Sequence, residues 1–193
     1  MPTKQSSESA DSVNPSPVKF QSGSKIIRVL GVDPGFGRTG LGVVDFHGSK
    51  PVHVWHSCID TPADAPFTER LQTVRNDIAE ALHRFKPHVA AVEKLFFQSN
   101  VKTAINVGMA RGVILLVLAD AGLLSVELNP NNIKQAVAGH GSADKKQIQA
   151  MVMRLLNLKS IPKPDDAADA LAIAIAGGYW HITQSKINGK NPR

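Results

Sequence analysis

Hydrophobic positions change their spacing several times along the chain, and each spacing predicts a type of element. Three segments near the start are rich in β-branched residues and are separated by short turns: residues 26–33, 41–46 and 51–60. Segments of this kind joined by short glycine-containing turns are typical of an antiparallel meander, so we expect three strands there. Apolar residues then recur at helical spacing over residues 67–85, with charged residues between them, which predicts an amphipathic helix.

The second half of the chain alternates between strand-like and helix-like segments. Short apolar runs at residues 88–93 and 124–128 predict two further strands. We expect four helices, near residues 100–121, 131–137, 142–156 and 165–182. Ser99 or Asn100 can cap the first of these helices, and Gly122 would end it. The order βββαβαβα with additional helical turns predicts the α/β class, a three-layer fold in which helices flank a five-stranded mixed sheet.

The two ends of the chain differ in composition from the part between them. Residues 1–25 contain seven Ser and three Pro, so we expect a disordered leader there. Residues 26–183 hold all the expected elements and have a length typical of one domain. Residues 184–193 contain three basic residues and no acid, and we expect them to form a flexible basic tail.

The net charge of +6 is distributed unevenly along the chain. Residues 26–183 contain 16 basic and 14 acidic residues, which excludes a uniformly basic nucleic-acid coat and leaves only local basic clusters to bind a polyanion. The single cysteine, Cys58, excludes an internal disulfide framework and indicates a reducing compartment. The longest apolar run, residues 113–119, is too short to span a membrane, and residues 1–25 lack the apolar core of a secretion signal. We therefore expect a cytoplasmic protein with no membrane partner.

Two of the expected strands end on an acid, Asp33 and Glu93. Both would project at the carboxyl edge of the sheet, where ligand and metal sites of α/β proteins concentrate. Projected at about 100° per residue, Asp166 and Asp169 fall on the apolar stripe of the last helix. Buried carboxylates repel one another, and a hard divalent cation such as Mg²⁺ or Mn²⁺ would relieve that repulsion. Two cations held by such carboxylates activate water and stabilise the leaving oxygen in phosphodiester hydrolysis.

These acids also have structural explanations. Glu93 could pair with a nearby base such as Arg111, which would neutralise it without a metal. Asp165 and Asp166 stand where acids cap a helix and complement its dipole. Asp169 lies a full turn inside the expected helix, so capping does not explain it.

Three other motifs compete with this interpretation. Residues 35–40, GFGRTG, match a dinucleotide-binding pattern, but alternating apolar residues follow instead of a helix, which predicts a hairpin turn. A strand, an acid, a glycine-rich turn and a second strand also occur in actin-like ATPases, but those enzymes need two lobes and this chain is long enough for one. His53, His56 and Cys58 suggest a metal site, yet regular strand alternation places His53 on the opposite face, so we expect no convergence.

Basic and aromatic residues near the acids are candidates for nucleic-acid contacts. Lys145 and Lys146 follow Ser142, a good helix N-cap, and a helix N-terminus beside two ammonium groups suits a phosphate. Solvated lysines on an ordinary helix are the alternative. Phe96 and Phe97 are adjacent in the segment after the second acidic strand end, where one ring could stack on an unpaired base or pack in the core.

Four segments in order resemble the RuvC family of Holliday-junction resolvases over about residues 26–180: LGVDPG, VEKLFF, NNIKQAVAGHGSADKKQ and DDAADALAIAIA. The resemblance implies a ribonuclease-H-like fold, a homodimer, and two Mg²⁺ ions per site, which Mn²⁺ can replace. It also implies an endodeoxyribonuclease that resolves four-way DNA junctions in recombination and repair by paired symmetric nicks, leaving 5′-phosphates and 3′-hydroxyls. The expected partners are junction DNA, a second copy of the chain and the RuvA–RuvB branch-migration complex.

The resemblance also assigns roles to single residues. The expected metal ligands and catalytic acids are Asp33, Glu93, Asp166 and Asp169, with Lys145 as a further catalytic group. The expected DNA-binding residues are Lys134, Lys145 and Phe96, with Lys146 and Phe97 as their neighbours. We expect the long helix over residues 101–121 to contribute to the dimer interface through Val113, Leu116 and Val117. A junction-binding module that does not cleave, or an actin-like ATPase lobe, are the alternatives.

Overall fold

The computed structural model describes residues 26–94 and 101–189. The strands within these residues are β1 (Ile27–Asp33), β2 (Arg38–His47), β3 (Lys50–Asp60), β4 (Val89–Glu93) and β5 (Leu124–Leu128). The helices are α1 (Phe67–Phe85), α2 (Val101–Asp120), α3 (Pro130–Ala138), α4 (Lys145–Leu155) and α5 (Asp165–Gly189). The predicted order of strands and helices is therefore confirmed.

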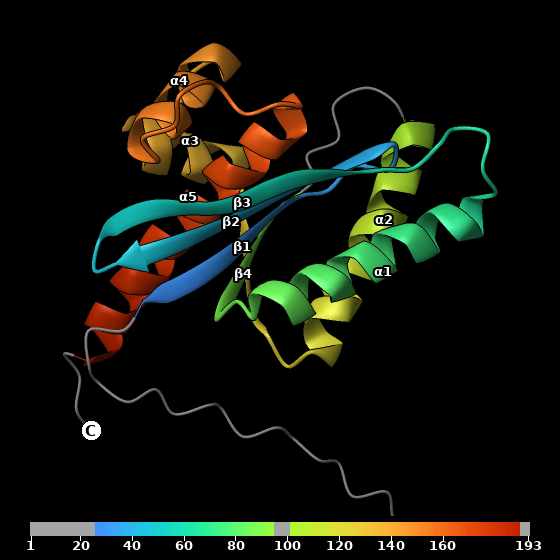
Figure 1. Ribbon diagram of the computed structural model, residues 1–193, viewed down its shortest axis with the longest axis horizontal. Helices are drawn as coiled ribbons and strands as arrows, with labels where there is room; N and C mark the ends of the chain where they lie inside the picture. Colours follow the sequence, from blue (N-terminus) through green and yellow to red (C-terminus); the bar gives the residue numbers. More distant parts are fainter. Residues whose placement is uncertain (1–25, 95–100, 190–193) are drawn as a thin grey trace, which may run out of the picture.

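All of these strands form one mixed sheet in the order β3-β2-β1-β4-β5. Strand β1 pairs antiparallel with β2 and β2 with β3, which is the predicted meander, whereas β1, β4 and β5 are parallel to one another. Helix α5 covers one face of the sheet with α3 and α4 outside it, and α1 and α2 cover the other face (Figure 1). The predicted three-layer α/β architecture is confirmed.

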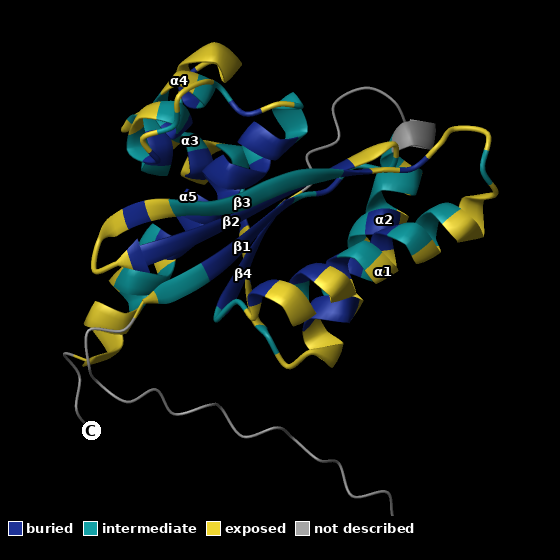
Figure 2. Cartoon of the chain, in the orientation of Figure 1, coloured by how far each residue is buried: buried dark blue, intermediate teal, exposed yellow. Residues whose placement is uncertain are grey.

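Each face of the sheet has its own apolar core. On the α5 face, Leu171, Ile173 and Ile175 are almost fully buried. On the opposite face, Ile78 of α1 and Leu118 of α2 are equally buried. Figure 2 shows the buried strands lying between these two layers of helices. Burying a side chain of this size stabilises a fold by roughly 1.5–3 kcal/mol, so the sheet and α5 form a firm base for the residues at their ends.

Glycines in the sheet allow α5 to lie close to it. Gly31 in β1 and Gly40 and Gly42 in β2 face this helix. A Cβ at Gly40 would collide with the carbonyl oxygen of Asp166, and a Cβ at Gly31 would collide with that of Ala170. Because glycine has no Cβ, the first turns of α5 come directly against the carboxyl end of β1.

Helix α4 begins later than the sequence predicts. Its N-cap is Asp144, whose side chain accepts a hydrogen bond from the Gln147 N–H at 2.8 Å, while the Gln147 side chain accepts one from the Asp144 N–H at 2.9 Å. This reciprocal pair is a capping box, which satisfies two free N–H groups where a single Ser142 cap would satisfy one. The expectation that Ser142 caps this helix is therefore wrong, and Lys145 becomes its first residue.

The ends of the other long helices were predicted in part. Helix α2 ends before Gly122, which has a positive φ of 62° as expected of a helix stop. Ser99 and Asn100, the expected caps at its start, lie outside the described residues. Helix α5 continues further than expected, to Gly189, because no glycine or proline interrupts it after Gly178. Residues 184–189 of the expected flexible tail are thus helical.

In the part of the chain that the structure describes, no helix combines the length and apolar character needed to cross a membrane.

Helix α2 turns one apolar stripe outward. Ile105, Met109 and Leu116 are 52%, 50% and 60% exposed. Of the residues expected at a dimer interface, Leu116 belongs to this stripe, whereas Val117 is buried in the core and Val113 packs against that core. The expectation is wrong for Val117, because its position on the helix faces the sheet instead of the outside.

Strand β3 carries a β-bulge opposite β2. Val43 pairs with Trp55 but the next residue, Val44, pairs with His53, so one residue of β3 is extra. His53 and His56 consequently lie on the same face, with Nε2 of the first 2.8 Å from Nδ1 of the second. The expectation that His53 faces away from His56 is wrong, because strict alternation of side chains holds only along a regular strand.

Candidate active site

Four acidic residues meet at the carboxyl edge of the sheet. Asp33 is the last residue of β1 and Glu93 is the last residue of β4, and these two strands are parallel neighbours. Asp166 and Asp169 lie in the first turns of α5, which the sheet glycines bring against this edge. Burial, followed by the charges of the other three acids, raises the pKa of Asp33 to about 8. The predicted juxtaposition of the four acids is thus present in the fold.

Two of the other acids are affected by burial and repulsion in the same way. The pKa values of Glu93 and Asp169 are raised, in both cases chiefly by burial, and the charge of Asp169 adds to the rise at Glu93. The positive charge of Lys134 and a hydrogen bond with Asp33 act in the opposite direction on the pKa of Glu93. Any proton or cation that binds among these carboxylates therefore relieves repulsion.

Lys145 supplies one such cation. Its Nζ lies 2.7 Å from Oδ2 of Asp165 and 2.9 Å from Oδ2 of Asp169. Hydrogen bonding to Asp165, and then to Asp169, raises the pKa of Lys145. Because Lys145 is the first residue of α4 and the two acids belong to α5, this ammonium group joins two helices across the edge of the site.

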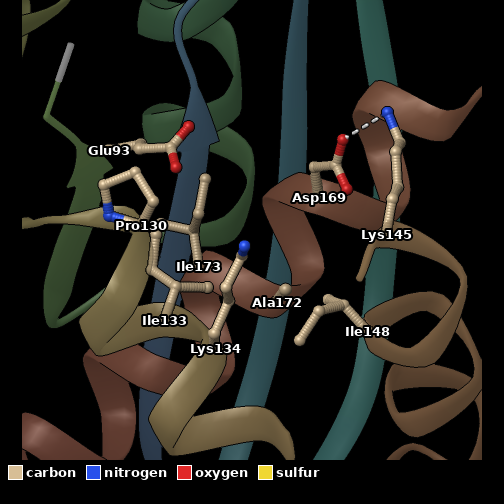
Figure 3. A pocket seen from close by; sticks show the side chains of 9 residues that line it. All are labelled: Glu93, Pro130, Ile133, Lys134, Lys145, Ile148, Asp169, Ala172 and Ile173. Atoms are coloured by element: carbon tan, nitrogen blue, oxygen red, sulfur yellow. Dashed lines mark ion pairs between the residues drawn. The ribbon is translucent and has the colours of Figure 1, made fainter. Parts of the chain in front are cut away.

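A pocket of about 230 Å³ opens beside the acids. Figure 3 shows Glu93 on one side of it and Asp169 with Lys145 on the other, and the Lys134 ammonium group pointing into the space between them. The lining residues are Glu93, Pro130, Ile133, Lys134, Lys145, Ile148, Asp169, Ala172 and Ile173. The pocket therefore brings together two predicted acids and two predicted lysines from four elements.

Two charged residues at this edge were missed at the level of sequence. Arg38, the first residue of β2, has its Nη1 atom 3.3 Å from Oδ2 of Asp166. Asp165, which we explained as a helix cap, binds Lys145. The four-residue spacing between Asp165 and Asp169 places both on one side of α5 and could have revealed that role, whereas nothing in the local sequence reveals that of Arg38.

The remaining predicted contacts fall in different places. Lys146 is exposed on the first turn of α4, next to Lys145. Phe96 and Phe97 lie outside the described residues. Arg111, considered above as a partner for the Glu93 side chain, donates instead to the Glu93 backbone oxygen at 3.3 Å and pairs with Glu127. The Glu93 carboxylate therefore remains directed at the pocket instead of being neutralised by Arg111.

The glycine-rich segment is a hairpin, as predicted. Strand β2 begins at Arg38, inside residues 35–40, and its Gly40 pairs with Asp33 of β1. A dinucleotide site would need a helix to begin at this point, with its N-terminus on the phosphates. The segment instead places Gly40 of β2 opposite Asp33 and against the first turn of α5.

The site fits a hard divalent cation by its donor set. Within residues 26–94 and 101–189, no group of three or more His, Cys, Asp or Glu side chains is arranged so that it could hold a metal ion as it stands. Asp169 is bound to Lys145 and Asp166 to Arg38, so cationic side chains occupy these carboxylates. All the donors are carboxylate oxygens, and burial together with the charges of the other acids raises the pKa of Asp33. Mg²⁺ and Mn²⁺ prefer such ligands.

Comparison with known proteins identifies relatives over most of the chain. The family model of the crossover junction endodeoxyribonuclease RuvC matches residues 29–177. The RuvC of Thermotoga petrophila is 49% identical over 160 residues, which cover 83% of this chain and 94% of the relative. The RuvC of Desulfitobacterium hafniense is 51% identical over 151 residues, which cover 78% of this chain and 92% of the relative.

Solved structures agree with this assignment. The RuvC of Thermus thermophilus superposes with a TM-score of 0.77 at 37% identity, covering 82% of this chain and 97% of the other. The same protein in complex with Holliday junction substrate gives a TM-score of 0.78 at 36% identity, covering 82% and 96%. The yeast mitochondrial Holliday junction resolvase Ydc2, at 19% identity and a TM-score of 0.62 over 83% of this chain and 80% of the other, shares the fold. The chain belongs to the RuvC family, and the predicted ribonuclease-H-like fold is confirmed.

Proposed function

We propose that this member of the RuvC family is an endodeoxyribonuclease that resolves four-way DNA junctions by paired symmetric nicks, leaving 5′-phosphates and 3′-hydroxyls. The observation that carries this proposal is the set of four mutually repelling carboxylates at one edge of the sheet, next to a pocket with two lysines. The Thermus thermophilus relative, solved with Holliday junction substrate, is 36% identical to this chain and supports the choice of substrate.

Asp33, Glu93, Asp166 and Asp169 would hold two Mg²⁺ ions, for which Mn²⁺ can substitute. When bound, these ions supply Lewis-acid stabilisation of the phosphodiester and of the leaving 3′-oxygen, and they lower the pKa of water. Asp33, with its pKa of about 8, retains a proton near neutral pH and releases it when a cation approaches its carboxylate. This exchange of a proton for a cation makes metal binding stronger as the pH rises.

Lys145 and Lys134 would act on the substrate directly. When Asp165 and Asp169 exchange the Lys145 ammonium group for other partners, Lys145 can donate hydrogen bonds to the negative charge that develops on the scissile phosphate. Lys134 points into the same pocket and would bind the neighbouring backbone. Lys146 would add a weaker phosphate contact from the exposed side of α4. Phe96 and Phe97 would stack on unpaired bases at the crossover.

The exposed stripe on α2 would form a homodimer interface. Ile105, Met109 and Leu116 recur at helical spacing, and Gly112 lies between the last two with open space where a side chain would be. A two-fold dimer presents two identical active sites, which matches the two-fold symmetry of a four-way junction and converts one nick into a pair. Leu116→Glu should make the protein monomeric in sedimentation velocity, and a fully dimeric variant would contradict this interface.

The nuclease domain would comprise residues 26–183, with residues 1–25 as a leader outside it. The helical residues 184–189 and the residues that follow would add a basic extension to the end of α5. We also propose that the chain works with a branch-migration complex of the RuvA–RuvB type, a partner that family membership supports.

Cleavage of an end-labelled synthetic four-way junction tests the proposal. The controls are a linear duplex of the same sequence, EDTA in place of the cation, and the Asp33→Asn variant. Paired nicks that DNA ligase can reseal, seen on the junction alone and abolished by EDTA and by Asp33→Asn, are the expected result. Junction binding without cleavage in either Mg²⁺ or Mn²⁺, over several crossover sequences, would contradict the nuclease and favour a recognition module.

A further inference from the structure

We propose that Arg38 binds a backbone phosphate of the cleaved strand, on the opposite side of the α5 acids from Lys145. The proposal rests on the endonuclease function proposed above and adds a DNA contact to it. It depends on three features of the described residues: how the backbone of Arg38 is held, how its side chain is held, and where it lies around the acids.

The backbone that carries Arg38 is held firmly. The turn before it, residues 34–37, is fastened at several points: the Thr61 N–H donates to the Gly37 oxygen at 2.9 Å, and the Thr39 hydroxyl donates to the Gly35 oxygen at 2.7 Å. Thr39 and Thr61 are both buried. Because these hydrogen bonds hold the turn, the backbone of the next residue, Arg38, has a fixed position at the edge of the sheet.

An aromatic and cationic cluster supports the same turn from outside. The Arg70 guanidinium lies 3.7 Å from the centre of the Phe36 ring and donates to the Phe36 backbone oxygen at 3.1 Å. Phe67, at the start of α1, packs on Phe36 with ring centres 5.0 Å apart. Arg70 is thus committed to holding the turn, and Arg38 is the arginine of this hairpin that faces the acids.

The side chain of Arg38, by contrast, is held loosely. Its Nη1 atom is 3.3 Å from Oδ2 of Asp166 and its Nε atom is 3.9 Å from Oδ1 of Asp60, and the arginine side chain is 52% exposed. Arg28, which has a structural role, makes two bonds of 2.7 Å and 2.8 Å to Asp45. Exposed and long ion pairs contribute little to stability, so Arg38 can leave Asp166 at small cost.

The position of Arg38 complements that of the lysines. Around α5, at about 100° per residue, Asp169 lies between Asp165 and Asp166. Lys145 binds the Asp165 and Asp169 side of this arc, and Arg38 binds the Asp166 side. The acids of α5 therefore lie between an ammonium group from α4 and a guanidinium group from β2. A DNA strand crossing the acids would meet one cation before the scissile phosphate and the other after it.

A guanidinium group suits the phosphate on the Arg38 side. It presents paired N–H donors that match two phosphate oxygens, and it is always charged. When a divalent cation takes the Asp166 carboxylate, Arg38 loses its nearest acidic partner just as a polyanion enters the site. The competing explanation is that Arg38 only orients Asp166, and the two explanations differ once Asp166 carries no charge.

Junction binding in the Asp166→Asn background separates these explanations. The asparagine removes the charge that Arg38 would orient and leaves the substrate uncut, so binding can be followed by fluorescence anisotropy of a labelled junction over a range of KCl concentrations. Adding Arg38→Ala should weaken junction binding about three- to tenfold and reduce the slope of log K against log salt by about one. Arg38→Lys should keep the slope, since it keeps the charge.

Arg75→Ala in the same background is the matched control, because Arg75 is an exposed arginine on α1, which covers the face of the sheet opposite α5 (Figure 1). It should change neither the affinity nor the salt slope. Unchanged affinity and slope on adding Arg38→Ala would overturn the phosphate contact. Cleavage by the unaltered chain distinguishes the two proposals: a chain that cuts junctions while Arg38→Ala leaves binding unchanged refutes this inference alone, whereas a chain that never cuts refutes the proposed function.

Discussion

The two ends of strand β1 differ in whether their charged side chains are neutralised by a partner. At its beginning, Arg28 pairs with Asp45 of β2 through two bonds of 2.7 Å and 2.8 Å, and it also donates to the Phe85 carbonyl of α1 at 3.0 Å. At its end, Asp33 lies among three other acids, and burial together with their charges raises its pKa to about 8. Two cations at this edge, Lys145 and Arg38, are bound to other acids of the cluster.

This difference separates a charge that stabilises the fold from charges that are kept for a reaction. The pair at the beginning of β1 is neutral as a unit and joins β1, β2 and α1. The acids at the end repel one another, so the folded protein is less stable than it would be with neutral side chains there. Excess negative charge of this kind is useful where cations must bind. The loss of stability that it causes therefore marks these acids as a functional site.

The largest expected effect comes from removing one charge at the reactive end. Asp33→Asn should reduce junction cleavage by roughly a thousandfold or more, since it removes an oxygen ligand from the centre of the acid cluster. The same change should raise the free energy of unfolding in EDTA, because a neutral asparagine avoids the burial and the repulsion that disfavour the Asp33 carboxylate. Single-turnover cleavage and urea unfolding measure the two effects. A variant that loses both activity and stability would show that Asp33 stabilises the fold, as Arg28 does, and would contradict the difference between the two ends.

The pH dependence of stability should also distinguish this end. Asp33 has an ordinary pKa of 3.8 and a folded-state pKa of about 8, so the folded state keeps a proton that the unfolded state releases. The stability that this proton confers is complete below pH 4 and is lost as the pH rises through 8. Relative to Asp33→Asn, the unaltered protein in EDTA should therefore lose roughly 2–4 kcal/mol between pH 5 and 8.

Urea unfolding of both proteins at each pH gives that difference. The comparison with Asp33→Asn is needed because burial lowers the pKa values of His53, His56 and His181, which favours folding as the pH rises. These histidines are the same in both proteins and cancel. A constant difference between the two proteins over this pH range would show that Asp33 is ionised throughout.

A smaller effect is expected at the lysine that bridges the acids. Lys145→Ala should lower the rate of junction cleavage by about a hundredfold, the size typical of losing one group that stabilises developing charge. Lys146→Ala, on the same turn but not among the residues that line the pocket, should lower it less than threefold. Single-turnover rates at saturating Mg²⁺ measure both variants. Equal losses in the two variants would indicate that the lysines act only through general attraction for DNA.

The smallest effect on activity is expected at the beginning of β1. Asp45→Asn should lower the free energy of unfolding by about 1–3 kcal/mol, because it leaves the partly buried Arg28 charge without its carboxylate. Cleavage by the folded protein should be unchanged. Asp64→Asn, at an exposed position, is the control for urea unfolding. Reduced cleavage by folded Asp45→Asn would mean that the two ends of the strand are coupled.

Much of the site could be predicted because its acids sit at positions that the sequence marks locally. Asp33 and Glu93 each end a strand-like apolar run, and Asp169 interrupts an apolar helical stripe. The errors arose where a distant or irregular feature intervened. The bulge in β3 reversed the face of His53 relative to His56, and the Asp144 capping box displaced the expected cap.

The sequence by itself determined the order of elements and the strand ends that carry acids. These features follow from the spacing of apolar residues and from backbone preferences, which act over a few residues. Only the tertiary structure decided which cation meets which acid. Lys145 reaches Asp165 and Asp169 from another helix, and Arg38 reaches Asp166 from a hairpin more than a hundred residues earlier. Such pairs depend on how whole elements pack, which no local pattern specifies.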